Sequence, residues 1–146
     1  MSGEISVSLV GLLPARRVLD SLSRLETSRL LEVLGSELES QTRRRIAAEK
    51  TDPDGVPWAG WSEAYAEQRP PKGGLLELSG GLIDSIAYEV GQDAVTVGSN
   101  LVYALTHQEG NSELGVPARP YLGVSDENIA DLGELLLEFL AEEVAA

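Results

Sequence analysis

A segment rich in proline and glycine, residues 51–81, most constrains the fold, because neither a helix nor a central strand continues easily through it. Its prolines and large aromatic residues are Pro53, Pro57, Pro70, Pro71, Trp58, Trp61 and Tyr65. A loop of this length within a compact domain is usually either structureless or devoted to contacts. We therefore expect residues 51–81, called the arm below, to be an extended loop that contacts a partner.

Hydrophobic residues before the arm recur at three- and four-residue steps from about residue 15 to residue 50, which is the spacing of a helix with one buried face. Thr27 and Ser28 have hydroxyls that can cap a helix, so we expect a short helix, a break near Glu26 and then a long helix. The long helix should end before the turn residues 52–55.

Alternating hydrophobic residues predict three strands. The first strand covers residues 5–9, and residues 86–90 and 95–97 flank the turn residues 91–93 as a β-hairpin. Ser125 is a predicted N-cap of a C-terminal amphipathic helix with an acidic outer face. The apolar stripe of this helix consists of Ile129, Leu132, Leu136, Phe139 and Leu140.

These elements predict an α+β fold in which residues 1–146 form a single domain. A small antiparallel sheet with a β-hairpin should pack against the long N-terminal helix and the C-terminal amphipathic helix. The arm should remain a long loop rich in proline, glycine and tryptophan.

The net charge of −13 comes from 24 acidic and 11 basic residues. Residues 1–50 carry eight basic and seven acidic groups, residues 51–100 two and eight, and residues 101–146 one and nine. A negative surface repels phosphate backbones, which argues against a general nucleic-acid-binding protein. The uneven distribution favours head-to-tail association, in which the first part of one copy meets the acidic part of the next.

The chain has no cysteine and a single histidine, His107. These counts exclude disulfides, thiolate nucleophiles, zinc sites built on sulfur and sites with several histidines. No run of about 18 apolar residues signals a membrane span, and the N-terminus lacks the pattern of an export signal. We expect no cofactor and no membrane association, and a protein assembled in the cytoplasm.

His107 also suggests the one enzymatic alternative, a triad with Asp84 and either Ser79 or Ser85. Neither serine lies in the Gly-x-Ser-x-Gly pattern that exposes a nucleophile. A structural histidine that donates one ring N–H to a nearby carbonyl is the favoured interpretation. We expect no catalytic activity.

Two further patterns resemble ligand sites. Asp52, Asp54 and Glu63 have the positions of three ligands in a calcium loop, but Pro57 stands where that loop needs glycine. A type I turn explains the same residues without a metal. The glycines of residues 71–74 lack the spacing that wraps a phosphate.

Three consecutive arginines, Arg43, Arg44 and Arg45, spread over about 200 degrees of a helix, so at least one points toward the core. They either pair with carboxylates of their own helix or form a basic edge that meets the acidic part of another copy. The carboxylates at helical spacing are Glu37, Glu39 and Glu49.

Two motifs contain side chains that suit an interface. Trp58 and Trp61 are either a lid over the chain's own core or anchors buried on assembly. Arg119 is held between two prolines, and its fork can bind a carboxylate or two carbonyls, within the chain or in a neighbouring copy. We expect Tyr121, which follows in the same motif, at the same interface.

Four segments together resemble the phage virion morphogenesis family, the tail-completion family of Mu-like and other contractile-tailed phages. They are residues 52–58 (DPDGVPW), 78–86 (LSGGLIDSI), 103–110 (YALTHQEG) and 116–123 (VPARPYLG). The motif residues are Pro53, Asp54, Gly55, Gly80, Leu82, Ser85, Tyr103, His107, Gly110, Pro117, Pro120 and Gly123.

The resemblance implies a structural, non-enzymatic virion protein of the head–tail junction or the tail end, which acts as a tail-completion, neck or tail-terminator protein. It implies a homo-oligomeric ring, with six copies favoured, that contacts other tail, tail-tube or head-connector proteins and lets DNA pass. The particle is a phage, a prophage product, a tail-like bacteriocin or a gene-transfer agent. The alternative is an acidic, non-catalytic regulatory binding module of the cytoplasm.

Overall fold

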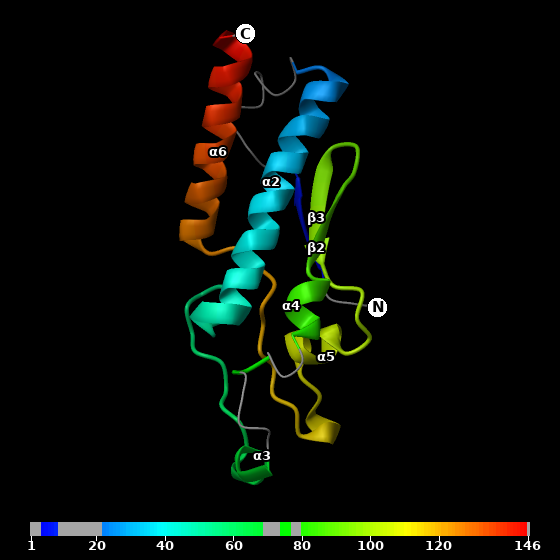
Figure 1. Ribbon diagram of the computed structural model, residues 1–146, viewed down its shortest axis with the longest axis vertical. Helices are drawn as coiled ribbons and strands as arrows, with labels where there is room; N and C mark the ends of the chain where they lie inside the picture. The colour runs from blue at the N-terminus through cyan, green and yellow to red at the C-terminus, as the bar shows by residue number, and fades with distance from the viewer. Residues whose placement is uncertain (1–3, 9–21, 69–73, 77–79, 146) are drawn as a thin grey trace.

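A three-stranded antiparallel sheet, a long helix on one of its faces and a second long helix beside the first make up the fold (Figure 1). The computed structural model describes residues 4–8, 22–68, 74–76 and 80–145. Its helices and strands, in chain order, are β1 (Glu4–Ser8), α2 (Arg24–Arg44), the π-helical turn η2 (Arg45–Glu49), α3 (Glu63–Gln68), α4 (Gly81–Ser85), β2 (Ala87–Val90), β3 (Ala94–Gly98), α5 (Ala104–Glu109), the 3-10 turn η3 (Ser112–Leu114) and α6 (Asp126–Ala145). The predicted α+β class is confirmed.

The sheet has the strand order β1-β3-β2, with β3 in the centre. Tyr88 of β2 pairs with Val97, and the Gly91 N–H donates to the Ala94 carbonyl at 2.8 Å to close the turn. The predicted hairpin is therefore confirmed. The predicted first strand is confirmed up to Ser8, whereas Leu9 lies outside the described residues.

Helix α2 begins earlier than the sequence predicts. Ser23 is its N-cap: the Ser23 hydroxyl accepts from the Glu26 N–H at 3.1 Å, and the Glu26 carboxylate accepts from the Ser23 N–H at 3.4 Å. This capping box satisfies two backbone donors, so Thr27 and Ser28 lie within the first turns. The predicted break near Glu26 is wrong for this reason. The predicted short helix before it falls largely on residues 9–21, outside the described part.

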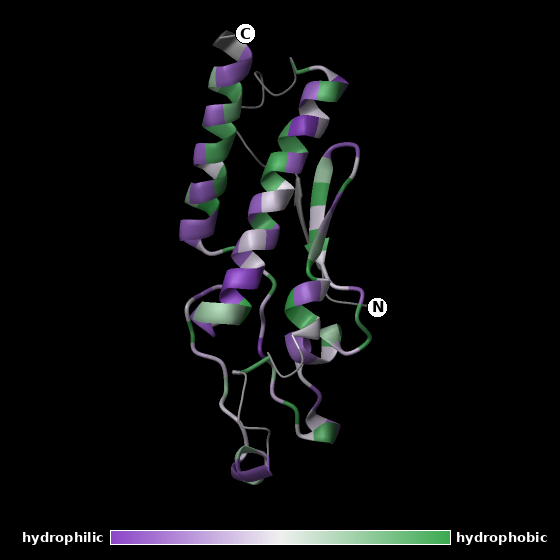
Figure 2. Ribbon diagram, viewed as in Figure 1, coloured by the Kyte–Doolittle hydropathy of each residue, from purple (hydrophilic) through white to green (hydrophobic). Residues whose placement is uncertain are grey.

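The core lies between α2 and the sheet, and α6 packs along α2 on the other side (Figure 1). Leu30, Leu31, Leu34 and Leu38 of α2 are buried, and Figure 2 shows hydrophobic and hydrophilic residues alternating along both long helices. Gly35 lets α2 approach the sheet closely, because a Cβ there would lie only 2.8 Å from Val95 Cγ2.

Helix α6 has the predicted N-cap. The Ser125 hydroxyl accepts from the Asn128 N–H at 3.0 Å, and Asn128 Oδ1 accepts from the Ser125 N–H at 3.1 Å. Leu136 and Phe139 are buried as expected. Ile129 is 52% exposed, so its place in the apolar stripe is wrong. Asn128 takes the inward position one helix turn before Leu132, which turns Ile129 away from α2.

The arm is not entirely irregular, because it contains the short helix α3. At its start, the Gly55 N–H donates to the Asp52 carbonyl at 3.0 Å, and Asp52 Oδ1 accepts from Asp54 and Val56 N–H groups, both at 2.9 Å. The predicted turn is confirmed, with Gly55 at a positive φ of 87°. Among the described residues, no group of acidic or histidine side chains is placed to hold a metal ion.

None of the helices in the described ranges is long and apolar enough to cross a membrane.

Candidate assembly surface

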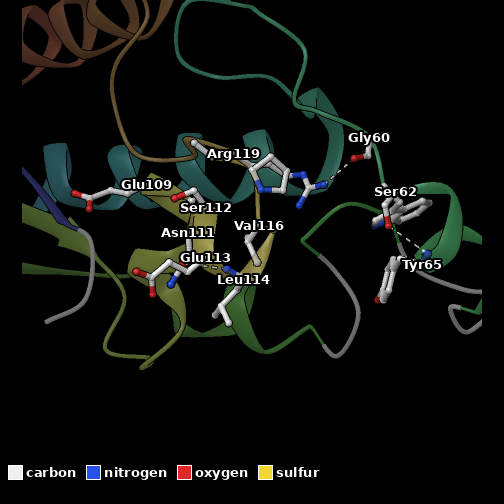
Figure 3. Close-up of a pocket in the computed structure, with 15 residues that line it drawn as sticks. Gly60, Ser62, Tyr65, Glu109, Asn111, Ser112, Glu113, Leu114, Val116 and Arg119 are labelled. Atoms are coloured by element: carbon white, nitrogen blue, oxygen red, sulfur yellow. Dashed lines mark hydrogen bonds between the residues drawn. The ribbon is translucent and has the colours of Figure 1, made fainter.

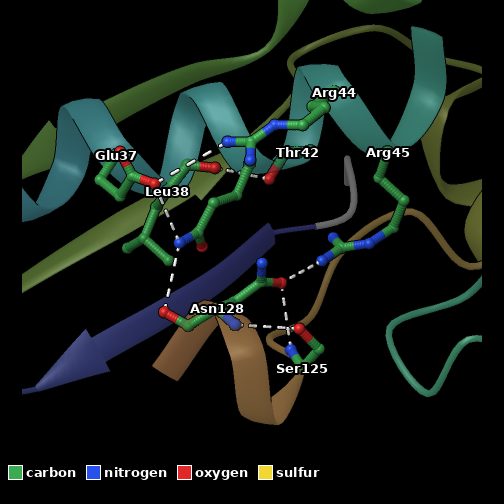
Figure 4. A network of polar contacts seen from close by, with 8 residues as sticks. Glu37, Leu38, Thr42, Arg44, Arg45, Ser125 and Asn128 are labelled. Atoms are coloured by element: carbon green, nitrogen blue, oxygen red, sulfur yellow. Dashed lines mark hydrogen bonds and ion pairs between the residues drawn. The ribbon is translucent and has the colours of Figure 1, made fainter. Parts of the chain in front are cut away.

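A buried arginine holds three parts of the chain together. Arg45 follows directly on α2, at the start of η2, and its side chain is only 1% exposed. Nη1 donates to the carbonyls of Tyr121 at 2.7 Å and Gly123 at 3.2 Å, and Nη2 donates to Asn128 Oδ1 (Figure 4). Burial lowers the pKa of the Arg45 guanidinium, since water no longer solvates the cation. These groups, called the Arg45 network, join α2 to residues 121–123 and to α6.

The other two arginines of the triplet stay near the surface and pair within α2. Arg43 lies 3.1 Å from Glu39 and also donates to the Ile86 carbonyl at 2.8 Å. Arg44 lies 3.8 Å from Glu37. The structure thus shows the intrahelical pairing that the sequence left as one of two alternatives. The other, contact with a neighbouring copy, stays a prediction.

Arg119 fastens the arm to residues 116–123. Its Nε donates to the Ala59 carbonyl at 2.8 Å and its Nη2 to the Gly60 carbonyl at 3.0 Å. Burial lowers the pKa of this guanidinium as well. The fork therefore binds two backbone carbonyls within one chain. Its predicted contact with a neighbouring copy is untested.

The two tryptophans differ in their surroundings. Trp58 is buried, and its indole N–H donates to the Pro120 carbonyl at 2.8 Å. Trp61 is only partly buried, and its ring centroid lies 6.3 Å from that of Tyr65. Trp58 thus closes over the chain's own core, whereas the predicted role of Trp61 as an anchor buried on assembly stays a prediction.

Tyr121 is fully buried and donates its hydroxyl to the Ala104 carbonyl at 2.9 Å. Burial raises the pKa of this phenol to about 12, because the phenolate is poorly solvated there. The interface roles predicted for Tyr121 and Arg45 stay untested, and burial of both side chains within one chain does not favour them.

The motif residues meet one another across the fold. Gly123 packs against Pro53, where a Cβ would lie 3.0 Å from Pro53 Cβ. Gly110 has a φ of 76°, and a Cβ there would lie 2.6 Å from the Ala118 N atom. Gly80 precedes α4 with a φ of 72°. These positions place two motifs distant in sequence, residues 52–58 and 116–123, side by side.

The remaining motif residues support α4 and α5. Leu82 is buried, and the Ser85 hydroxyl contacts the Leu82 carbonyl and the Ser99 hydroxyl, both at 2.6 Å. Tyr103 stands edge-on to the His107 ring at 5.5 Å. The sequence did not point to Gln108, whose Oε1 accepts from the N–H groups of Tyr121 and Leu122, both at 3.0 Å.

The described residues do not assemble the triad that the sequence allows. The Ser85 hydroxyl is hydrogen-bonded to the Leu82 carbonyl and the Ser99 hydroxyl. Asp84 is exposed, and Ser79 lies outside the described residues. His107 Nδ1 is buried and has no hydrogen-bond partner in the described part of the chain, so the expected N–H to carbonyl bond is not made from this nitrogen. Desolvation, and then the charge of Arg119, lower the pKa of His107.

An open groove of about 1200 Å³, called the end groove, lies at the end of the molecule that carries α3 (Figures 1 and 3). Trp61 and Tyr65 of the arm form one wall. Residues 109–118 form the opposite wall, with the Leu114 side chain 72% exposed and Glu109 and Glu113 exposed beside it. The end groove combines exposed hydrophobic groups with an acidic edge, which is the composition of a protein contact surface.

Helix α6 presents a second distinctive surface. It contains no lysine or arginine, and five of its carboxylates are exposed. These residues are Asp126, Glu127, Glu134, Glu138 and Glu142. The predicted acidic outer face of this helix is confirmed.

Comparison with known proteins identifies the family of this chain. Residues 12–141 match the phage virion morphogenesis family. The chain belongs to this family. A protein of Escherichia phage Mu described as putative capsid assembly protein G is 35% identical over 118 residues, which cover 73% of this chain and 75% of the Mu protein. No solved structure matches the chain.

The two motifs that lie side by side, residues 52–58 and 116–123, both fall within the part of the chain that matches the family. The match to the virion morphogenesis family spans α2, the arm, the hairpin, the end groove and most of α6. The candidate surfaces therefore lie within the part of the chain that matches the phage virion morphogenesis family.

Proposed function

We propose that this chain is a structural protein of the head–tail junction or of the tail end, which assembles as a ring that DNA can pass and performs no reaction. The observation that carries the proposal is membership of the phage virion morphogenesis family over residues 12–141. The similarity to a putative capsid assembly protein supports a role in building the particle. Assembly would take place in the cytoplasm of the bacterial host, before the particle is complete.

The charge distribution supports a channel for DNA. With a net charge of −13 and five exposed carboxylates on α6, a ring of this chain is able to present a negative lining. Like-charge repulsion would keep DNA from binding to the wall during passage. The net charge is then a requirement of the function.

The size of the chain is compatible with such a ring. A compact chain of this length has a radius of gyration of about 15 Å and is roughly 38 Å across. Six bodies of equal width in a ring leave a central hole about as wide as one body, which is wider than a DNA duplex.

The test combines assembly with complementation. Sedimentation velocity and negative-stain images are recorded for the purified protein alone and after mixing with tail tubes from particles that lack it. We expect rings in solution or at tube ends, and restored DNA delivery when the protein is supplied. A strict monomer in both settings, together with particles that mature normally without this protein, would contradict the proposal.

A further inference from the structure

The exposed hydrophobic side chains differ in the charges beside them. The large exposed ones among the described residues are Leu25, Val33, Val56, Tyr65, Val102, Tyr103, Leu114, Ile129 and Leu137. Leu25 alone directly adjoins an arginine in the sequence, whereas Tyr65 and Leu114 both line the end groove. Of these nine side chains, Leu25 thus has a basic neighbour, and Tyr65 and Leu114 lie together in one groove.

Leu25, the exposed hydrophobic residue with a basic neighbour, lies at the start of α2. Arg24, Leu25 and Arg29, called the basic turn, lie within the first two turns, and Leu25 is 71% exposed. The Glu26 carboxylate turns back to the Ser23 N–H, and Arg29 lies 3.2 Å from Glu143. Arg24 has no ion-pair partner among the described residues. Arg24 and Leu25 together therefore present a cation beside an apolar side chain.

The end groove has the complementary character. Leu114 and Tyr65 supply apolar surface on its two walls, and Glu109 and Glu113 are exposed along one of them (Figure 3). Among the described residues that line it, Arg119 is the one cation, and it already donates to the carbonyls of Ala59 and Gly60. The groove thus suits an apolar side chain that has a cation beside it.

The two surfaces cannot meet within one chain. The basic turn lies at the end of the molecule opposite to α3 and the end groove (Figure 1), and the 21 residues of α2 alone span about 30 Å. A contact between them must join two copies. Because it pairs different surfaces, it is heterologous, and repeated contacts of this kind close into a ring when the rotation per copy allows.

We propose that the basic turn of one copy docks in the end groove of the next copy, with Leu25 between Leu114 and Tyr65 and Arg24 facing Glu109 and Glu113. This inference rests on the proposed ring and names the contact that closes it. The occupant of the groove is a second copy of this chain, selected by charge and by the placement of both surfaces at opposite ends.

Disulfide trapping tests the contact directly, because the chain contains no cysteine. Leu25→Cys and Leu114→Cys are prepared separately, mixed with mild oxidant under the conditions in which the wild type forms rings, and analysed without reductant. We expect linked dimers only in the mixture, and a ladder of linked oligomers from the double variant. Both side chains are more than 70% exposed, so the substitutions should not disturb folding.

Val102→Cys is the matched control, since Val102 is 96% exposed and lies outside the groove lining. A mixture of Leu25→Cys with Val102→Cys should remain unlinked. Linking within either single variant alone, or equal linking to the control, would overturn the head-to-tail contact. Linking of the Leu114 position to a different virion protein in mature particles would overturn the choice of occupant.

Charge reversal supplies a second readout. Arg24→Glu and Glu113→Arg should each raise the concentration needed for half-assembly roughly tenfold, which corresponds to about 1.4 kcal/mol. The double variant should recover most of this loss, whereas Glu89→Arg, an exposed change on β2, should leave assembly as in the wild type. Weaker assembly of both single variants without recovery in the double variant would contradict the pairing of Arg24 with Glu113.

The outcomes separate the two proposals. If the wild type forms rings and the cysteine pairs stay unlinked, the docking contact is wrong and the ring protein remains. If the wild type forms no ring, alone or on tail tubes, the proposed function itself fails.

Discussion

The Arg45 guanidinium is a buried cation whose described hydrogen-bond partners are two backbone carbonyls and the Asn128 side-chain amide, and none of them is a carboxylate. Burial of such a group costs free energy unless its N–H groups find acceptors. The Arg45 network supplies acceptors for both terminal nitrogens, whereas Nε is buried without a partner among the described residues. The same residue joins the end of α2 to the start of α6. Arg45 shares this role with Gln41 of α2, whose Nε2 donates to the Asn128 carbonyl at 3.2 Å, so two side chains join the long helices at this end.

Replacing Arg45 by methionine should lower the free energy of unfolding by about 2–4 kcal/mol, because the carbonyls of Tyr121 and Gly123 and the Asn128 amide lose their donor. Urea unfolding followed by circular dichroism measures this loss. Arg44→Met is the control, and its exposed side chain predicts a change within about 0.5 kcal/mol. Equal stability of both variants would contradict a structural role for the network.

His107 should make stability depend on pH. Its pKa is lowered from the usual 6.5 in the folded chain, so the unfolded chain binds the proton more readily. The free energy of unfolding should therefore fall as the pH drops below about 7, until the folded-state pKa is passed. Urea unfolding in buffers from roughly pH 7.5 down to about pH 5.5 measures the slope. The slope should shrink in His107→Gln, and an unchanged slope would assign it to other groups.

Tryptophan emission should report on Trp61 during assembly. Trp58 is already buried in the single chain, whereas Trp61 lines the end groove. A blue shift of emission on ring formation should persist in Trp58→Phe and vanish in Trp61→Phe. A shift that survives in Trp61→Phe would show that the groove is not covered on assembly.

At the level of elements, the close approach of α2 to the sheet depends on Gly35. Gly35→Ala places a methyl group against Tyr88 and Val95, and should destabilise the fold by about 1–3 kcal/mol. Gly133→Ala in α6 is the matched control, because a Cβ there meets nothing within 4 Å. It should stabilise the fold by about 0.5–1 kcal/mol through helix propensity. Thermal unfolding of both variants tests the difference, and equal effects would contradict it.

The sequence predicted elements better than contacts. Helical spacing and strand alternation located α2, the hairpin and α6, because each of these patterns reflects burial against one neighbour. The start of α2 was missed because Ser23 and Glu26 form a capping box that competes with Thr27 and Ser28. Ile129 was misplaced because a polar residue, Asn128, holds the inward position through Arg45.

The candidate site was only partly predictable. Sequence reasoning indicated that one arginine of residues 43–45 points inward, but its partners, residues 121–128, lie about 80 residues away. Likewise, Gln108 binds two N–H groups of a segment that only the fold brings near. Contacts of this kind depend on tertiary arrangement, which local periodicity does not encode.

For the whole molecule, the lining of the proposed channel is open to test. Glu134→Lys combined with Glu138→Lys reverses two exposed charges on α6 and should slow DNA delivery by retaining DNA at the wall. Phage titre and DNA release from complemented particles measure the effect. Glu89→Lys with Asp93→Lys, the same change of charge on the hairpin, is the control. Equal DNA delivery by the wild type and both double variants would contradict the proposal of an acidic lining.

Hydrogen bonds hold the arm to the rest of the chain near both of its ends. Trp58, Ala59 and Gly60 are bonded to residues 119 and 120, and the Lys50 ammonium donates to the Leu75 carbonyl at 2.8 Å. Both ends of the wall that the arm contributes to the end groove are thus held by hydrogen bonds before a neighbour arrives. A largely preorganised contact loses little conformational entropy on association, so a small groove is able to support a lasting joint between copies.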